Sequence, residues 1–130
     1  MWNELLNQND IDSLMETYGG FHDGCLVKLK YTSGVYVDEK LNMRFDASHK
    51  VQIIFQRQYR NTKTIEFEFE VATHLNIRAN NVDEVIIYGA SIFFFEDKIY
   101  WADCYGIKPP MENYKGTWVC AEKARWQIID

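Results

Sequence analysis

Three chemically active side chains, those of His22, Asp23 and Cys25, lie close together in the stretch GGFHDGC. An imidazole beside a carboxylate and a thiol could carry out acid–base or nucleophilic chemistry. Adjacent side chains on an extended backbone point to opposite sides, however, so adjacency alone does not build a His–carboxylate dyad. We therefore interpret the stretch as a structural corner, in which glycines end a helix and Phe21 fills the core. The alternative hypothesis is a small-ligand or catalytic site at His22 and Asp23.

That alternative needs further groups from elsewhere in the chain, and we expect Asp103 and Cys104 to join it. It predicts a concave apolar pocket that contains these side chains. We expect no metal site and no cofactor, because His49 and His74 lack ligand spacing to another donor. The three cysteines are widely separated and include no CxxC pair, which argues against a zinc site and a disulfide framework. No nucleophile-elbow or phosphate-loop motif occurs, so we assign no catalytic residue.

A second candidate is the acidic stripe of Glu66, Glu68 and Glu70, which alternates with large apolar residues. Alternation of this kind is typical of a strand with one buried and one solvated face. The ordinary interpretation is a solvated face whose carboxylates pair with basic residues on neighbouring strands. The candidates for such pairs are Lys28, Lys30 and Arg44.

The functional interpretation of the same stripe is a docking surface for a protein partner. Exposed aromatic rings inside a charged rim are typical of tight interfaces, and Tyr100, Tyr105 or Tyr114 could supply them. The chain carries 14 Lys and Arg against 19 Asp and Glu, a net charge of -5. This balance disfavours nucleic acid as a ligand and favours a basic protein.

The elements that must position these residues begin with one predicted helix, from about Ile11 to Tyr18. Its apolar residues recur at i, i+3, i+4 and i+7, which is one helical face. Asp10 is expected to cap its N-terminus and Gly19 to end it. Residues 2–6 are expected to form a short turn that packs as an arm.

The rest of the chain alternates with a period of two, which predicts strands. Residues 25–31 and 41–45 are expected to pair as a hairpin, and strands at 51–55 and 65–71 follow. The runs 85–88 and 92–95 are uniformly apolar, as in a central strand covered on both faces.

The remaining strands predicted lie at 99–101 and 118–129. A tight turn at 96–98 precedes the first of them. The second is long, and we expect it to break near 121–124. Between the two, residues 106–116 form a long turn-rich loop of a kind that is often functional.

These elements predict an α+β fold, mostly β. We expect an antiparallel sandwich or strongly bent sheet of about seven or eight strands with one N-terminal helix, in a single domain over residues 1–130. The N-terminus lacks the basic and apolar regions of a signal peptide, and no apolar run is long enough to span a membrane. Together with the unpaired cysteines, these features favour a cytoplasmic location.

The order of these features resembles a known family. Phe21-His22-Asp23 leads into a strand, and the apolar runs at 53–55, 65–69 and 85–87 follow. This order is similar to the immunity proteins of bacterial polymorphic toxin systems, the Immunity protein 50 group, over roughly residues 21–100. The resemblance implies a protein that binds and silences a toxin domain and has no enzymatic activity.

Two hypotheses follow from the sequence. The first is a cytoplasmic protein-binding module, with an immunity protein as one form, that holds a partner on its acidic sheet face or on loop 106–116. The second is the small-ligand or catalytic domain with its site near His22 and Asp23. Homo-oligomerisation is compatible with either, because an aromatic-rich β chain tends to leave an edge or face to be covered.

Overall fold

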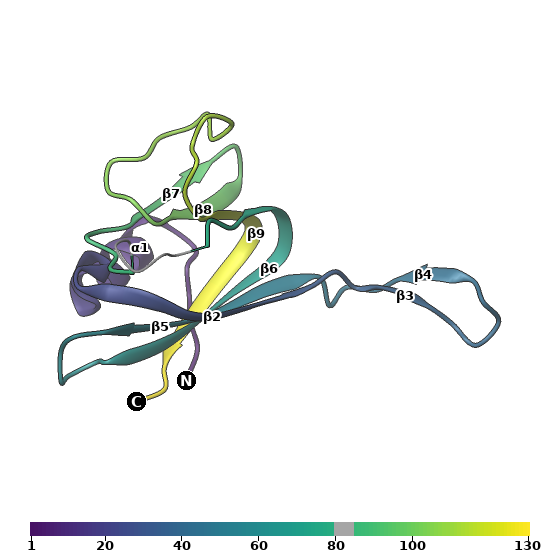
Figure 1. The fold of residues 1–130 in the computed structure, drawn as a ribbon, viewed down its shortest axis with the longest axis horizontal. Helices are drawn as coiled ribbons and strands as arrows, with labels where there is room; N and C mark the ends of the chain where they lie inside the picture. The colour runs from purple at the N-terminus through teal and green to yellow at the C-terminus, as the bar shows by residue number, and fades with distance from the viewer. Residues whose placement is uncertain (80–84) are drawn as a thin grey trace.

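The fold is a strongly bent antiparallel sheet with one α-helix, seen here in a computed structural model that describes residues 1–79 and 85–130 (Figure 1). This confirms the predicted α+β, mostly β class. Seven strands form one sheet in the order β2-β5-β6-β9-β8-β7, with β1 attached to β9. The strands of this sheet are β1 (Asn3–Glu4), β2 (Gly24–Thr32), β5 (Lys50–Arg57), β6 (Thr64–Asn76), β7 (Ser91–Phe95), β8 (Lys98–Ala102) and β9 (Trp118–Ile128). No helix in the described ranges is long and apolar enough to cross a membrane.

The last strand along the chain, β9, lies in the middle of the sheet. One of its edges pairs with β6 along its whole length, while β8 and β1 share the other edge. The predicted break near 121–124 is wrong. Ala121 pairs with Ala72 on one side and with Ile99 on the other, so two ladders hold the strand continuous.

The sheet bends at an irregularity in β6. The pairing of β6 with β9 shifts in register between Ala72 and His74. Val71 has a positive φ of 53°, and its N–H donates to the carbonyl oxygen of His49 at 3.0 Å. A bulge of this kind increases the local twist, which turns the two halves of the strand relative to each other.

Helix α1 (Gln8–Thr17) begins three residues earlier than predicted. Its N-cap is Asn7, whose Oδ1 accepts from the N–H of Asp10 at 3.0 Å, while Asp10 Oδ2 accepts from the N–H of Asn7 at 3.2 Å. Asp10 is thus the third residue of a capping box and not the cap itself. The segment before the helix forms strand β1, and not the short turn that we expected.

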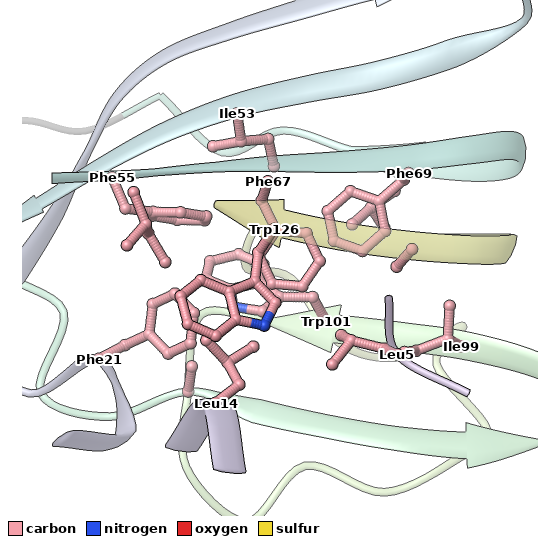
Figure 2. Close-up of a cluster of buried hydrophobic side chains, with 14 of the residues drawn as sticks. Leu5, Leu14, Phe21, Ile53, Phe55, Phe67, Phe69, Ile99, Trp101 and Trp126 are labelled. Atoms are coloured by element: carbon pink, nitrogen blue, oxygen red, sulfur yellow. The ribbon is translucent and has the colours of Figure 1, made fainter. Parts of the chain in front are cut away.

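The core fills the concave side of the sheet with aromatic and aliphatic side chains (Figure 2). Phe55, Phe67, Phe69 and Trp101 have no exposed surface. Helix α1 closes the core with Ile11 and the fully buried Leu14. The alternation predicted for 65–69 is confirmed on this face of the sheet.

The corner at residues 19–25 inserts Phe21 into this core. The ring of Phe21 lies 5.1 Å from that of Tyr18, 5.0 Å from Phe55 and 5.8 Å from Trp101, each in an edge-on arrangement. Phe21 is the last residue of the short 3-10 helix η1 (Gly19–Phe21), in which both glycines have positive φ. The corner is therefore built to place one aromatic side chain.

Arg57 ties the corner to the turn between β5 and β6. Its guanidinium donates to the carbonyl oxygens of Thr62 at 2.7 Å, Asn61 at 2.8 Å and Thr17 at 3.3 Å. Its Cζ also lies 4.7 Å from the ring centre of Tyr18 and 4.8 Å from that of a second tyrosine in the turn. The last turn of α1 is thereby fixed to the sheet.

The predicted hairpin of 25–31 with 41–45 is wrong. Strand β2 pairs with β5, and the short strands β3 (Val35–Val37) and β4 (Met43–Phe45) pair with each other. Figure 1 shows them as a two-stranded arm that projects from the body on the side away from α1. We call residues 33–49 the arm.

The predicted central strand at 85–88 and 92–95 is also wrong. Residues 85–88 meet the sheet only through a bridge in which Ile87 and Gly24 exchange two hydrogen bonds, of 2.7 and 3.3 Å. Strand β7 pairs with β8 alone and lies at the end of the sheet. The tight turn expected after it is confirmed, since Glu96 and Asp97 join β7 to β8.

We predict that Phe21→Ala lowers the free energy of unfolding by about 3–5 kcal/mol, because it leaves a cavity among three buried rings. His22→Ala should change it by less than about 0.5 kcal/mol, because this imidazole is exposed and packs on nothing in the core. Urea unfolding followed by tryptophan fluorescence measures both. Equal losses in the two variants would contradict the interpretation of residues 19–25 as a corner built around Phe21.

Candidate binding surfaces

His22 and Asp23 contact each other, contrary to our expectation. His22 Nδ1 lies 3.1 Å from Asp23 Oδ2, with 56% and 36% of the two side chains exposed. The expectation assumed an extended backbone, whereas Asp23 has a φ of 58°, which brings its side chain back beside the imidazole. The pair lies at the surface of the corner.

The groups proposed to join this pair lie elsewhere. Asp23 lines a hollow of about 490 Å³ with Cys25, Arg57 and Lys63, whereas Asp103 lines a different hollow of about 150 Å³. The carboxylate of Asp103 accepts from the hydroxyl of Tyr114 and from the N–H of Thr117, the latter at 3.1 Å. Asp103 is therefore engaged in holding the loop that precedes β9. Cys104 is exposed beside it.

The acidic stripe lies on the outer face of the sheet, but its neighbours are not the predicted ones. Glu68 faces Gln52 on β5 and Arg125 on β9, and Arg125 Nη2 donates to Glu68 Oε1 at 2.8 Å. The same guanidinium approaches Glu70 at 3.4 Å, and Gln127 donates to Glu66 at 2.8 Å. Of the predicted partners, Lys28 and Lys30 lie beyond β5, and Arg44 pairs with Asp38 in the arm at 2.8 Å.

Because of these contacts, the acidic stripe is not a free acidic surface. Glu68 is only 4% exposed, and a second layer covers its partner, because Arg125 Cζ lies 4.2 Å from the ring centre of Trp2. Lys50 and Lys123 flank Glu70 on the two adjacent strands. Glu68 and Glu70 thus have basic neighbours, Glu66 has a neutral hydrogen-bond donor, and these cross-strand pairs stabilise the sheet.

Carboxylates that form no salt bridge with another described residue gather around a hollow beside β1, the β7–β8 turn and β9. We define the acidic groove as a hollow of about 540 Å³ between the N-terminal segment, the β7–β8 turn and β9. Its lining residues are Glu4, Leu5, Leu6, Phe94, Phe95, Glu96, Asp97, Glu122, Lys123 and Ala124. Four carboxylates face one lysine, and none of the four forms a salt bridge with another described residue.

Apolar side chains share the acidic groove with these charges. Leu6 is 71% exposed, and Phe94 and Phe95 are about 40% exposed. Glu96 and Asp97 form the two-residue turn beside them, with φ of 51° and 63°. Two positive φ values are the signature of a type I′ turn, which fits the twist of a hairpin and holds these carboxylates on a rigid element.

Loop 106–116 forms a second hollow that meets the acidic groove at Phe95. This loop hollow, of about 310 Å³, is lined by His74, Phe95, Tyr100, Pro109, Pro110, Met111, Glu112 and Trp118. The rings of His74 and Trp118 stack at 5.0 Å, and Tyr100 lies 6.2 Å from Trp118 in a parallel arrangement. Glu112 adds a fifth carboxylate to the combined surface.

The loop is anchored to the body at several points. Asn76 Nδ2 donates to the carbonyl oxygen of Gly116 at 2.6 Å, and Met111 is buried against the outer face of β8 and β9. Burial and the hydrogen bond to Asp103 raise the pKa of Tyr114 well above its ordinary value. Tyr105 is 82% exposed at the start of the loop and lines neither hollow.

No group of three or more His, Cys, Asp or Glu side chains in residues 1–79 and 85–130 could hold a metal ion. No family model, curated protein or solved structure matches this chain. The similarity to immunity proteins thus stays a prediction made from the residues.

No local pattern in the sequence predicted the acidic groove. Its carboxylates come from three segments, at residues 4, 96–97 and 122, which meet only because β1 and β8 share one edge of β9. Only the turn at Glu96 and Asp97 was visible beforehand, and nothing indicated that it would face the N-terminal segment.

We predict that Arg125→Ala lowers the free energy of unfolding by about 1–3 kcal/mol, because it leaves the buried Glu68 carboxylate unpaired. Glu96→Gln should change it by less than about 0.5 kcal/mol, because this carboxylate has no partner to lose. Chemical denaturation of both variants gives the comparison. If Arg125→Ala has the same free energy of unfolding as the wild type, another group must compensate the Glu68 carboxylate, and the prediction is wrong.

We predict that the protein loses stability as the pH rises above 10. Burial raises the pKa of Tyr18, and a hydrogen bond with Cys120 followed by burial raises that of Tyr100 to about 12. The hydroxyls of Tyr18, Tyr100 and Tyr114 therefore lose their protons at a higher pH in the folded state than in the unfolded state, where their pKa is 10.0. The stability that this pKa difference contributes is fully present below pH 10, and it is lost as the pH rises through the folded-state pKa values.

Urea unfolding at intervals from pH 8 to 11 measures the slope. Tyr114→Phe should reduce the slope, while Tyr105→Phe, which removes a solvent-exposed hydroxyl, should leave it unchanged. A wild-type stability that is constant up to pH 11 would contradict the prediction.

Proposed function

We propose that this chain is a protein-binding module that holds a basic protein partner in the acidic groove. The observation that carries the proposal is the set of four unpaired carboxylates around exposed Phe94 and Phe95. On the outer sheet face, by contrast, Glu68 and Glu70 pair with Arg125, and Glu66 accepts a hydrogen bond from Gln127. The groove is therefore a place where several carboxylates without a salt bridge to another described residue lie beside exposed apolar side chains.

The groove has the composition that a protein interface uses. Phe94, Phe95 and Leu6 offer apolar surface that a partner can desolvate, and aromatic side chains of this kind provide much of the affinity of an interface. The surrounding carboxylates would select a partner with complementary charge and speed its association. The net charge of -5 acts over longer distances in the same direction.

The resemblance to immunity proteins supplies the kind of partner. Such proteins act by stoichiometric binding in the bacterial cytoplasm, where they silence a toxin domain. A rigid acidic surface on a small domain is compatible with this role, since electrostatic steering lets an inhibitor capture its target rapidly. In this proposal the partner is a basic toxin domain, and the chain carries out no reaction of its own.

The proposal predicts that a Glu96→Gln, Asp97→Asn variant loses partner affinity by about tenfold or more, which is about 1.4 kcal/mol. Asn tolerates positive φ, so the turn should persist in this variant. The tagged wild-type chain, this variant and the control variant described below are each used to capture proteins from the native cytoplasm. The partner identified is then purified for titration calorimetry at two salt concentrations.

The matched control is Glu66→Gln, Glu70→Gln, which changes the net charge by the same amount on the outer face of the sheet. It should keep the wild-type affinity. Binding should also weaken as salt rises, because the charges of the groove are exposed. Equal binding by the groove variant and the wild type, or a partner with an acidic contact surface, would refute the proposal.

A further inference from the structure

The arm presents one apolar face that no other part of residues 1–79 and 85–130 covers. Val35 lies opposite Phe45 and Val37 lies opposite Met43, so these four side chains share one face of the two-stranded ribbon. They are between 49% and 70% exposed. The other face carries the pair of Tyr36 and Arg44, in agreement with the alternation of a strand.

Several hydrogen bonds fix the conformation of the tip of the arm, although the hairpin is exposed. Asp38 accepts from the backbone N–H groups of Lys40 and Asn42 at 2.9 and 3.0 Å and from Arg44 Nε at 2.8 Å. These interactions hold the pKa of Asp38 below its ordinary value, the bond with Arg44 being the main cause. An isolated two-stranded hairpin is at best marginally stable in water, so an ordered apolar ribbon points to a covering partner.

Leu41 at this tip is the clearest sign of such a partner. It is 85% exposed and has a φ of 65°, in a backbone region where Gly, Asn or Asp is usual. A bulky apolar side chain there gains nothing from the chain that carries it. Backbone conformations of this kind persist where the side chain has a use.

The base of the same face opens into a hollow. The ring of Phe45 lies 6.0 Å from that of His49, and the ring of His49 lies 6.4 Å from that of Tyr31. Tyr31 and His49 line a hollow of about 640 Å³ at the bulge of β6, whose other lining residues are Ala72, Thr73, His74 and Leu75. The arm thus has an exposed Leu41 at its tip, an apolar face along its two strands and a hollow at its base.

We infer that two copies of this chain pair through their arms about a two-fold axis. The apolar faces of the two ribbons pack against each other in antiparallel fashion, and Leu41 of each copy enters the hollow at the base of the other arm. A two-fold interface must be self-complementary, because the same surface is used on both sides. A projecting tip and a hollow at opposite ends of the arm meet this condition.

The area available agrees with a specific dimer. The exposed side chains are those of Tyr31, Val35, Val37, Leu41, Met43 and Phe45, each about half exposed or more. With about 150–250 Å² for the full surface of a large side chain, they expose on the order of 600 Å² in one copy. Two copies together reach roughly 1,200 Å², the lower limit for stable specific interfaces.

This pairing goes beyond the proposed function and uses a different surface. No residue of the arm lines the acidic groove, so the dimer would present two grooves to partners. Failure of either proposal leaves the other standing, since variants of Glu96 and Asp97 test the groove and variants of the arm test the pairing.

The test is the molar mass of the purified full chain, measured by analytical ultracentrifugation over a dilution series from about 100 to 1 μM. We expect twice the chain mass of 15.4 kDa at the upper end. Val37→Thr, Met43→Thr removes apolar surface but keeps residues compatible with a strand, and it should be monomeric throughout. The control is Tyr36→Thr on the opposite face, which should dimerise as the wild type does.

Leu41→Asp tests where the tip lies. Asp is compatible with the positive φ, so the fold is retained, and circular dichroism with thermal unfolding verifies this for every variant. We expect its dimer dissociation constant to rise at least tenfold. A monomeric wild type at 100 μM, or equal association by the apolar-face variant and its control, would overturn the inference. An unchanged Leu41→Asp dimer would overturn the placement of the tip.

Discussion

The burial of Phe21 is the constraint on which the rest of the architecture depends. Its ring is the point where the end of α1, strand β5 and strand β8 come into contact. To reach that point the chain adopts positive φ at four of the five residues from Gly19 to Asp23. Phe21 and Asp23, the two non-glycine residues in this region, cost about 1–2 kcal/mol each, whereas burial of a phenylalanine contributes about 1.5–3 kcal/mol and each of its three ring contacts adds about 0.5–1.5 kcal/mol. The corner is stable because the aromatic gain exceeds the local strain.

Once the concave face is filled, the pairing of β6 with β9 decides which charges are available. At the centre of the sheet each carboxylate has neighbours on both sides, so Glu68 and Glu70 share Arg125. At the end of the sheet, Glu96 and Asp97 lie in a turn with no strand beyond them. Cross-strand neighbours, and not the count of acidic residues, therefore distinguish carboxylates such as Glu68, which form salt bridges, from Glu96 and Asp97, which form none with another described residue.

The sequence predicted what depends on local periodicity. The alternation of Ile65, Phe67 and Phe69 identified the buried face of β6, and the glycines at 19 and 20 identified the end of the helix. It could not predict partners that lie far apart, such as Glu68 and Arg125, which are 57 positions apart. It also could not separate strands by environment: 85–88 has the apolar run of a central strand yet meets the sheet at a single bridge. The hairpin was misassigned for the same reason, because Leu41, Met43 and Phe45 alternate as core residues do although all three are exposed.

The central position of β9 has a consequence for synthesis. The ribosome releases this strand after every other element of the sheet, yet β1, β6 and β8 all form ladders with it. Until it emerges, the nascent chain has only the β2-β5-β6 and β7-β8 fragments, with Phe67 and Phe69 on an open edge strand. The sheet can therefore be completed only after β9 has been translated, and until then β6 exposes an unpaired edge of the kind that promotes association between chains.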